Sequence, residues 1–261
     1  MPHWDRELET AIAASRKAAD IALSMQAGIA SEAKTDGSPV TDADRKCEAV
    51  IAAALLEAFP GDGLLGEEGA NAESRTGRRW IIDPIDGTRD YVRGNPLWCN
   101  LIGLEAGGEI VAGVASVPAL GLMCFASRGG GAFRNNARIR ASAKSTFAES
   151  VLCLNGVNRL DRLPFRDALL ECLPEFWAVR SLGGAPDALL VASGQADFWI
   201  EPVAAAWDLA PLQIILEEAG ARCSSFDGQR TIYAGNFVAY APTLETSVAK
   251  LLSLKQQARK V

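Results

Sequence analysis

The sequence predicts an α+β fold, and three observations support this class. Apolar residues recur at helical spacing through most of residues 4–59. Short apolar runs separated by glycine and proline turns follow between residues 63 and 126, as in antiparallel strands. After residue 150, strand-like and helix-like segments alternate, which is typical of an α/β layer.

The first helix is predicted over residues 4–26, where Gly28 follows as a stop signal. Residues 34–39 are polar and rich in turn-forming residues, so they predict a surface loop or a loose hairpin. A second helix begins after Thr41 and ends before Pro60-Gly61. Asp44 stands three residues after Thr41, as in a capping box, and its simplest role is to complement the helix dipole.

The centre of the predicted site is a short apolar run at residues 80–82 that ends in two aspartates, Asp83 and Asp86. Pro84 has no N–H to donate to a central ladder, so the strand is expected to end there. Side chains alternate along a strand, and carboxylates three positions apart converge only if the backbone turns between them. The same turn would aim the Ile85 carbonyl inward.

Two carboxylates and a carbonyl form an oxygen-rich site that suits Mg²⁺. If Gly87 and Thr88 begin a helix, their amides offer hydrogen-bond donors to an anion. Residues 63–66 predict another brief strand that ends in carboxylates, Glu67 and Glu68. A metal beside an anion indicates phosphate chemistry, although a strand followed by an Asp-rich turn remains the simpler alternative.

The next strands form a predicted antiparallel meander over residues 97–104, 110–117 and 122–126. Residues 110–127 carry no charge and approach the length of a membrane span, but Gly113, Pro118 and Gly121 favour two strands joined by a turn. The glycine-rich residues 128–131 lack the lysine of a phosphate-binding P-loop and predict a turn.

The second half predicts strands at residues 150–154, 177–179 and 198–200, and helices at residues 165–172, 185–192 and 208–219. A soft boundary near residues 144–146 divides the chain into halves, 1–144 and 145–261, within one compact unit. Glu201 ends the last of these strands. Pro211 fits only the first turn of a helix, so Asp208 is placed at a helix start, either as a cap or as a further acidic ligand.

Composition narrows the function classes. The 261 residues carry a formal net charge of −6 without a long basic stripe, which argues against a nucleic-acid surface. The six cysteines include no CxxC pair and no signal-like amino terminus precedes them, so we expect reduced thiols and a cytoplasmic protein. His3 is the only histidine, which leaves no residue for a Ser-His pair or a phosphohistidine.

Two phosphatase signatures are matched only in part. Cys153 and Arg159 have the Cys-x₅-Arg spacing of cysteine phosphatases, but Asn155, Val157 and Asn158 make a poor glycine-rich cradle, so we interpret the match as coincidence. The aspartate-nucleophile signature places its two aspartates two positions apart. Here the spacing is three, which favours shared metal ligation over an aspartyl-phosphate nucleophile.

Taken together, the motifs resemble those of the inositol monophosphatase family, which are magnesium-dependent, lithium-sensitive phosphatases. The resemblance covers nearly the whole chain and involves residues 34–44, 66–68, 80–88, 207–208 and 217–221. It implies a layered αβαβα sandwich, a homodimer without membrane or nucleic-acid partners, and two or three Mg²⁺ ions.

The resemblance also implies roles for individual residues. The metal ligands would be Glu67, Asp83, the Ile85 carbonyl, Asp86 and Asp208, with Asp44 near a third, weaker metal. Thr88, held by Asp44, would act with Glu67 to activate a water molecule, while the amides of Gly87 and Thr88 cradle the phosphate. The expected substrate contacts are Glu201, Gly183 and Ala185.

The expected activity is hydrolysis of a small phosphomonoester, with inositol monophosphate as the first candidate and L-histidinol phosphate as the alternative. A non-catalytic regulatory binding protein is the hypothesis from a different class. Arg89-Asp90-Tyr91 departs from the family pattern and places extra charge at the pocket entrance. A substrate with a second phosphate is less expected, because no basic cluster is obvious in the second half.

Overall fold

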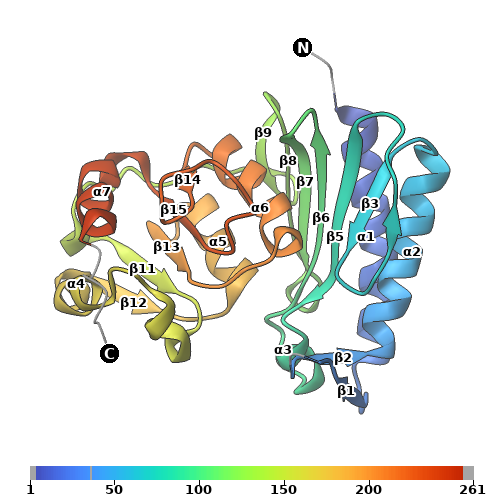
Figure 1. Ribbon diagram of the computed structural model, residues 1–261, viewed down its shortest axis with the longest axis horizontal. Coiled ribbons are helices and arrows are strands. Elements are labelled where there is room, and N and C mark those ends of the chain that lie inside the picture. Colours follow the sequence, from blue (N-terminus) through green and yellow to red (C-terminus); the bar gives the residue numbers. More distant parts are fainter. Residues whose placement is uncertain (1–3, 36, 255–261) are drawn as a thin grey trace.

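The computed structural model describes residues 4–35 and 37–254, so the single histidine, His3, lies outside the described residues. Within them the chain forms the five αβαβα layers that the family resemblance implies (Figure 1). Helices α1 (Asp5–Met25) and α2 (Asp42–Ala58) cover one face of the first sheet. Helices α5 (Gly184–Ala192) and α6 (Ala206–Glu218) fill the middle layer, and α4 (Arg166–Cys172) and α7 (Glu245–Ser253) cover the outer face of the second sheet.

The first sheet has the strand order β10-β9-β8-β7-β6-β5-β3-β4, and every neighbouring pair is antiparallel except β3 and β5. Its strands are β3 (Gly63–Gly66), β4 (Asn71–Ala72), β5 (Arg78–Asp86), β6 (Cys99–Ala106), β7 (Glu109–Val117), β8 (Leu122–Ser127), β9 (Gly131–Arg134) and β10 (Ala137–Arg138). The predicted meander is confirmed, and the uncharged residues 110–127 are two strands joined by a turn. Among the described residues, no helix combines the length and apolar character needed to cross a bilayer.

The second sheet has the strand order β12-β11-β13-β15-β14, and β11 is parallel to both of its neighbours. Its strands are β11 (Val151–Leu154), β12 (Ala178–Arg180), β13 (Phe198–Glu201), β14 (Arg222–Ser224) and β15 (Phe237–Tyr240). A small hairpin of β1 (Ser31–Ala33) and β2 (Pro39–Thr41) and the short helix α3 (Thr88–Val92) lie beside the first sheet at the end where β5 stops (Figure 1).

The prediction that the strand ends at Pro84 is wrong, because β5 continues through Pro84 to Asp86. Its pairing with β6 shifts between Asp83 and Asp86, where one extra residue forms a bulge. A bulge leaves one residue outside the ladder, which tolerates a proline that has no N–H. The backbone turn predicted between the two aspartates is this bulge. The side-chain amide of Asn100 donates a hydrogen bond to the Pro84 carbonyl within it.

The prediction for Pro211 is also wrong in detail, because α6 begins at Ala206 and Pro211 lies in its second turn. Asp208 nevertheless stands in the first turn, as predicted. The helix packs on two glycines of the sheet, and a Cβ on Gly113 would lie 2.7 Å from the Cα of Pro211. A Cβ on Gly103 would lie 2.7 Å from the Cβ of Ala210. These glycines allow the helix that carries Asp208 to approach the sheet closely.

The apolar core follows the layers. Along β5, Trp80 and Ile82 face the core under α1 and α2, whereas Ile81 faces the core shared with α5, α6 and the second sheet. That shared core includes residues from both sides of the boundary predicted near residue 145. The division into halves remains a prediction.

Candidate active site

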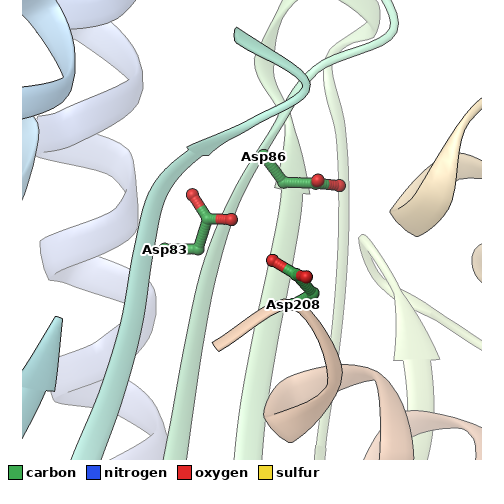
Figure 2. A group of neighbouring side chains, drawn as sticks. All are labelled: Asp83, Asp86 and Asp208. Carbon is green, nitrogen blue, oxygen red and sulfur yellow. The ribbon is translucent and has the colours of Figure 1, made fainter. Parts of the chain in front are cut away.

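Three carboxylates converge where the bulge of β5 meets the start of α6. Asp83 and Asp86 come from β5 and Asp208 from α6, and Figure 2 shows their side chains pointing into one shared space. One carboxylate oxygen from each residue lies within 4.8 Å of the others. Such a group of hard oxygen donors could hold a metal ion.

A backbone N–H orients each of the three carboxylates. The donors are Ile85 to Asp83 at 3.0 Å, Ala185 to Asp86 at 3.2 Å, and Ala205 to Asp208 at 2.7 Å. Asp208 therefore caps its helix and also faces the other aspartates, so both of its predicted roles fit the structure. Preorientation of this kind reduces the cost of collecting three like charges around a cation.

The pKa values of these carboxyls reflect the crowding. Burial raises the pKa of Asp83 above its usual range, and the charges of Glu67, Asp86 and Asp208 raise it further. Burial also raises the pKa of Asp86 to about 6 and, together with the charge of Asp86, that of Asp208 to about 7. A cation among them would favour the charged forms.

Glu67 lines the same cavity, but its carboxylate is occupied by another side chain. The Lys34 ammonium is 2.8 Å from Glu67 Oε1 and 2.6 Å from Glu68 Oε1. Lys34 directly follows β1, so its ion pairs join this hairpin to the segment that carries Glu67 and Glu68. Burial opposes the charge of Lys34, but the hydrogen bonds to both glutamates raise its pKa above the usual range.

Glu48 supports the Glu67 segment, although it is absent from the sequence prediction. Its carboxylate accepts the N–H of Glu68 at 2.8 Å and that of Ala70 at 2.7 Å. A Cβ on Gly66 would lie 2.3 Å from Glu48 Oε2, so only glycine leaves room for this carboxylate. Glu48 stands one helical turn after Asp44 on α2, and this i, i+4 spacing is the signal that could have identified it.

Asp44 is fully buried behind the cavity and serves two functions at once. Its Oδ2 accepts the Thr41 N–H at 2.8 Å and the Thr41 hydroxyl at 2.5 Å, which confirms the predicted capping box. Its Oδ1 lies 3.3 Å from the Thr88 hydroxyl. That hydroxyl is also 3.1 Å from the Ile85 carbonyl oxygen. The structure thus places Thr88 next to Asp44, as the resemblance implies.

Gly87 precedes α3 and has a positive φ of 86°, which an L-residue rarely adopts. A Cβ there would also lie 3.0 Å from the Leu97 carbonyl oxygen. Glycine therefore permits the sharp change from β5 into α3, and Gly87 and Thr88 both line the cavity.

The cavity has a volume of about 590 Å³, and all but one of the predicted site residues line it. Glu67, Asp83, Ile85, Asp86, Gly87, Thr88, Gly183, Ala185, Glu201 and Asp208 line it, together with Arg89 and Asp90 at the predicted entrance. Asp90 accepts a hydrogen bond from Asn95 at 2.6 Å. Asp44 is the one predicted site residue that does not line the cavity.

Glu201 is nearly inaccessible, with 3% of its surface exposed. Its Oε2 accepts a hydrogen bond from the Asn155 amide at 2.6 Å, and the backbone N–H of Val203 also contributes a hydrogen bond to the carboxyl. Burial raises the pKa of Glu201 to about 8, against the hydrogen bond from Asn155, and the nearby charges of Asp86 and Asp208 contribute. Sequence reasoning misses Asn155 as its partner, because no local motif joins the two residues.

The cysteine-phosphatase signature is not an active site. Cys153 is fully buried in β11, and burial and the adjacent Asp187 raise the pKa of its thiol. A thiol kept protonated is a poor nucleophile. Arg159 does line the cavity, but Cys153 does not. The spacing match is a coincidence, as predicted.

Comparison with known proteins agrees with this geometry. The model of the inositol monophosphatase family matches residues 3–257. The chain belongs to the inositol monophosphatase family. A histidinol-phosphatase of Mycobacterium tuberculosis is 39% identical over 85% of this chain and 87% of its own length. An inositol-1-monophosphatase of Mesorhizobium japonicum is 37% identical over 87% of each chain.

A solved inositol monophosphatase structure, that of Thermotoga maritima, superposes with a TM-score of 0.85 at 29% identity, covering 95% of this chain and 96% of the other. The α+β fold is therefore that of the inositol monophosphatases. As a member of a family whose relatives are named phosphatases, this protein is a phosphoric monoester hydrolase, and its acidic cluster could bind a metal.

Proposed function

We propose that the protein hydrolyses a small phosphomonoester with the help of Mg²⁺, and that L-histidinol phosphate is its substrate. The convergence of Asp83, Asp86 and Asp208 in the cavity supports the metal-dependent reaction. The choice of substrate rests on Glu201, a buried carboxyl in the lining of the same cavity, and on the 39% identity to a relative named histidinol-phosphatase. A buried carboxylate is stabilised most by a cation, and the ammonium of histidinol phosphate supplies one.

The residues present fit a magnesium site. The donor set consists of oxygens, and the carboxyls destabilise each other's charged forms, as their raised pKa values indicate. Asp83, Asp86 and Asp208 would hold the ions, with Glu67 and the Ile85 carbonyl as further donors. When bound, Mg²⁺ supplies Lewis-acid stabilisation of the charge that develops on the phosphoryl oxygens.

The proposed proton pathway begins at Thr88. Its Oγ1 accepts a hydrogen bond from the attacking water and donates its own proton toward Asp44 Oδ1, which lies 3.3 Å away. The capping bonds from Thr41 keep Asp44 in place. Following the family resemblance, we propose that Glu67 also orients this water. The amides of Gly87 and Thr88 would hold the phosphate at the start of α3.

Inositol monophosphate is the second candidate, because a hydroxyl can also donate a hydrogen bond to a carboxylate such as that of Glu201. A neutral hydroxyl compensates a buried charge less than an ammonium does. The regulatory-binder alternative is less favoured, since three of the candidate metal carboxylates, Asp83, Asp86 and Asp208, converge. Following the family resemblance, we also propose a cytoplasmic homodimer with two or three Mg²⁺ ions, which light scattering and calorimetric titration would test.

The deciding experiment compares kcat/KM for L-histidinol phosphate, inositol 1-phosphate and adenosine 3′,5′-bisphosphate at millimolar Mg²⁺. We expect histidinol phosphate to be preferred by at least about tenfold, the usual worth of one charge-assisted hydrogen bond. Preference for inositol 1-phosphate would replace the proposed substrate. Absence of phosphate release from all three substrates would contradict the proposed function itself.

A further inference from the structure

Asp187 is a fully buried carboxylate on α5 that does not line the cavity. It accepts the N–H of Leu182 with both oxygens, each at 3.2 Å, and the N–H of Gly183 at 3.3 Å. The thiol of Cys153 contributes a further hydrogen bond. Burying a carboxylate costs free energy, and hydrogen bonds to its oxygens offset that cost. Asp187 therefore ties the chain that leads into α5 to the helix itself.

The segment that Asp187 holds has a high intrinsic freedom. Gly183 and Gly184 are consecutive, and glycine loses more conformational freedom on folding than any other residue. Gly183 also has a positive φ of 119°, which L-residues rarely adopt. Leu182, the residue before them, is 37% exposed, so apolar packing fixes this segment only weakly. The hydrogen bonds to Asp187 supply the restraint that the segment itself lacks.

This segment leads directly into the candidate metal site. Gly183, Gly184 and Ala185 line the cavity, and the Ala185 N–H donates a hydrogen bond to Asp86 Oδ2 at 3.2 Å. Such a bond weakens steeply when the donor moves or turns away from its acceptor. The orientation of the Asp86 carboxylate therefore depends on the backbone that Asp187 restrains.

We infer that Asp187 is a positioning residue for the metal site, whose carboxylate fixes residues 182–185 so that the Ala185 N–H holds Asp86 in its metal-binding orientation. This inference rests on the proposed function, because it takes Asp86 as a ligand of Mg²⁺. Asp187 acts through the backbone and does not itself line the cavity. Loss of a group that orients a metal ligand typically weakens metal binding by about 10–100-fold.

The test compares Asp187→Asn with a matched control, Asp197→Asn. Asparagine keeps the shape of the side chain but has one acceptor oxygen, so an N–H of the segment loses its partner. Asp197 is also buried, at 4% exposure, and accepts the Val151 N–H at 2.6 Å, but it lies at the opposite end of β13 from Glu201. Both variants remove one buried carboxylate and should be less stable than the wild type.

Calorimetric titration with Mg²⁺ separates the two variants without turnover. Asp187→Asn should raise the Mg²⁺ dissociation constant about tenfold, whereas Asp197→Asn should change it less than about twofold. At saturating Mg²⁺, the kcat of Asp187→Asn should return to within about threefold of the wild-type value. An unchanged dissociation constant in folded Asp187→Asn, or an equal rise in both variants, would assign Asp187 to stability alone and overturn the inference.

Amide hydrogen exchange tests the restraint in the wild-type protein, even if Asp187→Asn fails to fold. The N–H groups of Leu182 and Gly183 should exchange as slowly as those inside α5, and rapid exchange at both would overturn the inference.

The inference and the proposed function fail in different ways. If the wild-type protein binds Mg²⁺ and Asp187→Asn binds it about tenfold more weakly, but no phosphate is released, the proposed function fails and the inference stands. If phosphate is released and the two proteins bind Mg²⁺ equally well, the inference fails and the proposed function stands.

Discussion

The backbone amide of Ala185 donates a hydrogen bond to Oδ2 of Asp86 over 3.2 Å, although the residues are 99 positions apart in the sequence. This bond joins the first turn of α5 to the end of β5, and Ala185 is one of the residues predicted from the sequence to contact the substrate. Ala185 therefore positions a candidate ligand from the opposite half of the chain.

Asp86→Asn should lower kcat by about 10³-fold with the fold intact, because one metal-binding charge is worth several kcal/mol of transition-state stabilisation. The metal-free variant should melt at the same temperature as the wild type or above it, since the substitution removes a crowded charge. Mg²⁺ should raise the melting temperature of the wild type and much less that of the variant. Near-normal turnover in Asp86→Asn would show that Asp86 is not a metal ligand.

Glu201→Gln should change how the stability of the metal-free protein depends on pH. The pKa of Glu201 is raised from an ordinary value of 4.5 to about 8 in the folded state, mainly by burial. Between these values the folded state binds more protons than the unfolded state, so this group lowers stability as pH rises. The melting temperature of the variant minus that of the wild type should therefore increase from pH 5 to pH 8. A constant difference across this range would contradict the raised pKa.

Glu48→Gln tests the support of the Glu67 segment. The substitution replaces a carboxylate that accepts two backbone amides with a group that has one acceptor oxygen, so one N–H is left unpaired. We expect a loss of about 1–3 kcal/mol in unfolding free energy and about a tenfold higher Mg²⁺ concentration for half-maximal activity. Urea denaturation and Mg²⁺ titration measure the two effects. Glu57→Gln, on an exposed position of the same helix, is the control and should change neither.

Much of the site could be predicted because its residues stand at the ends of strands and helices, where local patterns are informative. Asp83, Asp86 and Asp208 follow strong apolar runs or precede a proline, and the structure brings all three together. The strand was wrongly predicted to end at Pro84, because whether a proline ends a strand depends on how the neighbouring strand pairs with it. Asn100 accommodates it in a bulge that no pattern within β5 encodes.

The parts that sequence reasoning missed depend on long-range packing. No element was predicted after residue 219, yet β15 pairs with both β13 and β14 in the second sheet. Its run of four apolar residues is too short to distinguish from a loop without its neighbours. Likewise, Asn155 binds Glu201 only because β11 lies next to β13. Such contacts follow from topology, which spacing along the chain does not specify.

Gly113→Ala tests whether the close packing of α6 on the first sheet positions Asp208. The new Cβ would lie 2.7 Å from the Cα of Pro211 and 2.8 Å from its carbonyl oxygen, so the helix backbone has to move. We expect a loss of about 1–3 kcal/mol in unfolding free energy. Because Asp208 stands three residues before Pro211, kcat and Mg²⁺ affinity should fall as well, even at temperatures where the variant is fully folded. Gly61→Ala is the control, since its Cβ would meet only the Thr76 methyl group, at 2.8 Å, and that side chain can shift. A folded Gly113→Ala protein with wild-type kcat and Mg²⁺ dependence would show that the position of Asp208 does not depend on this contact.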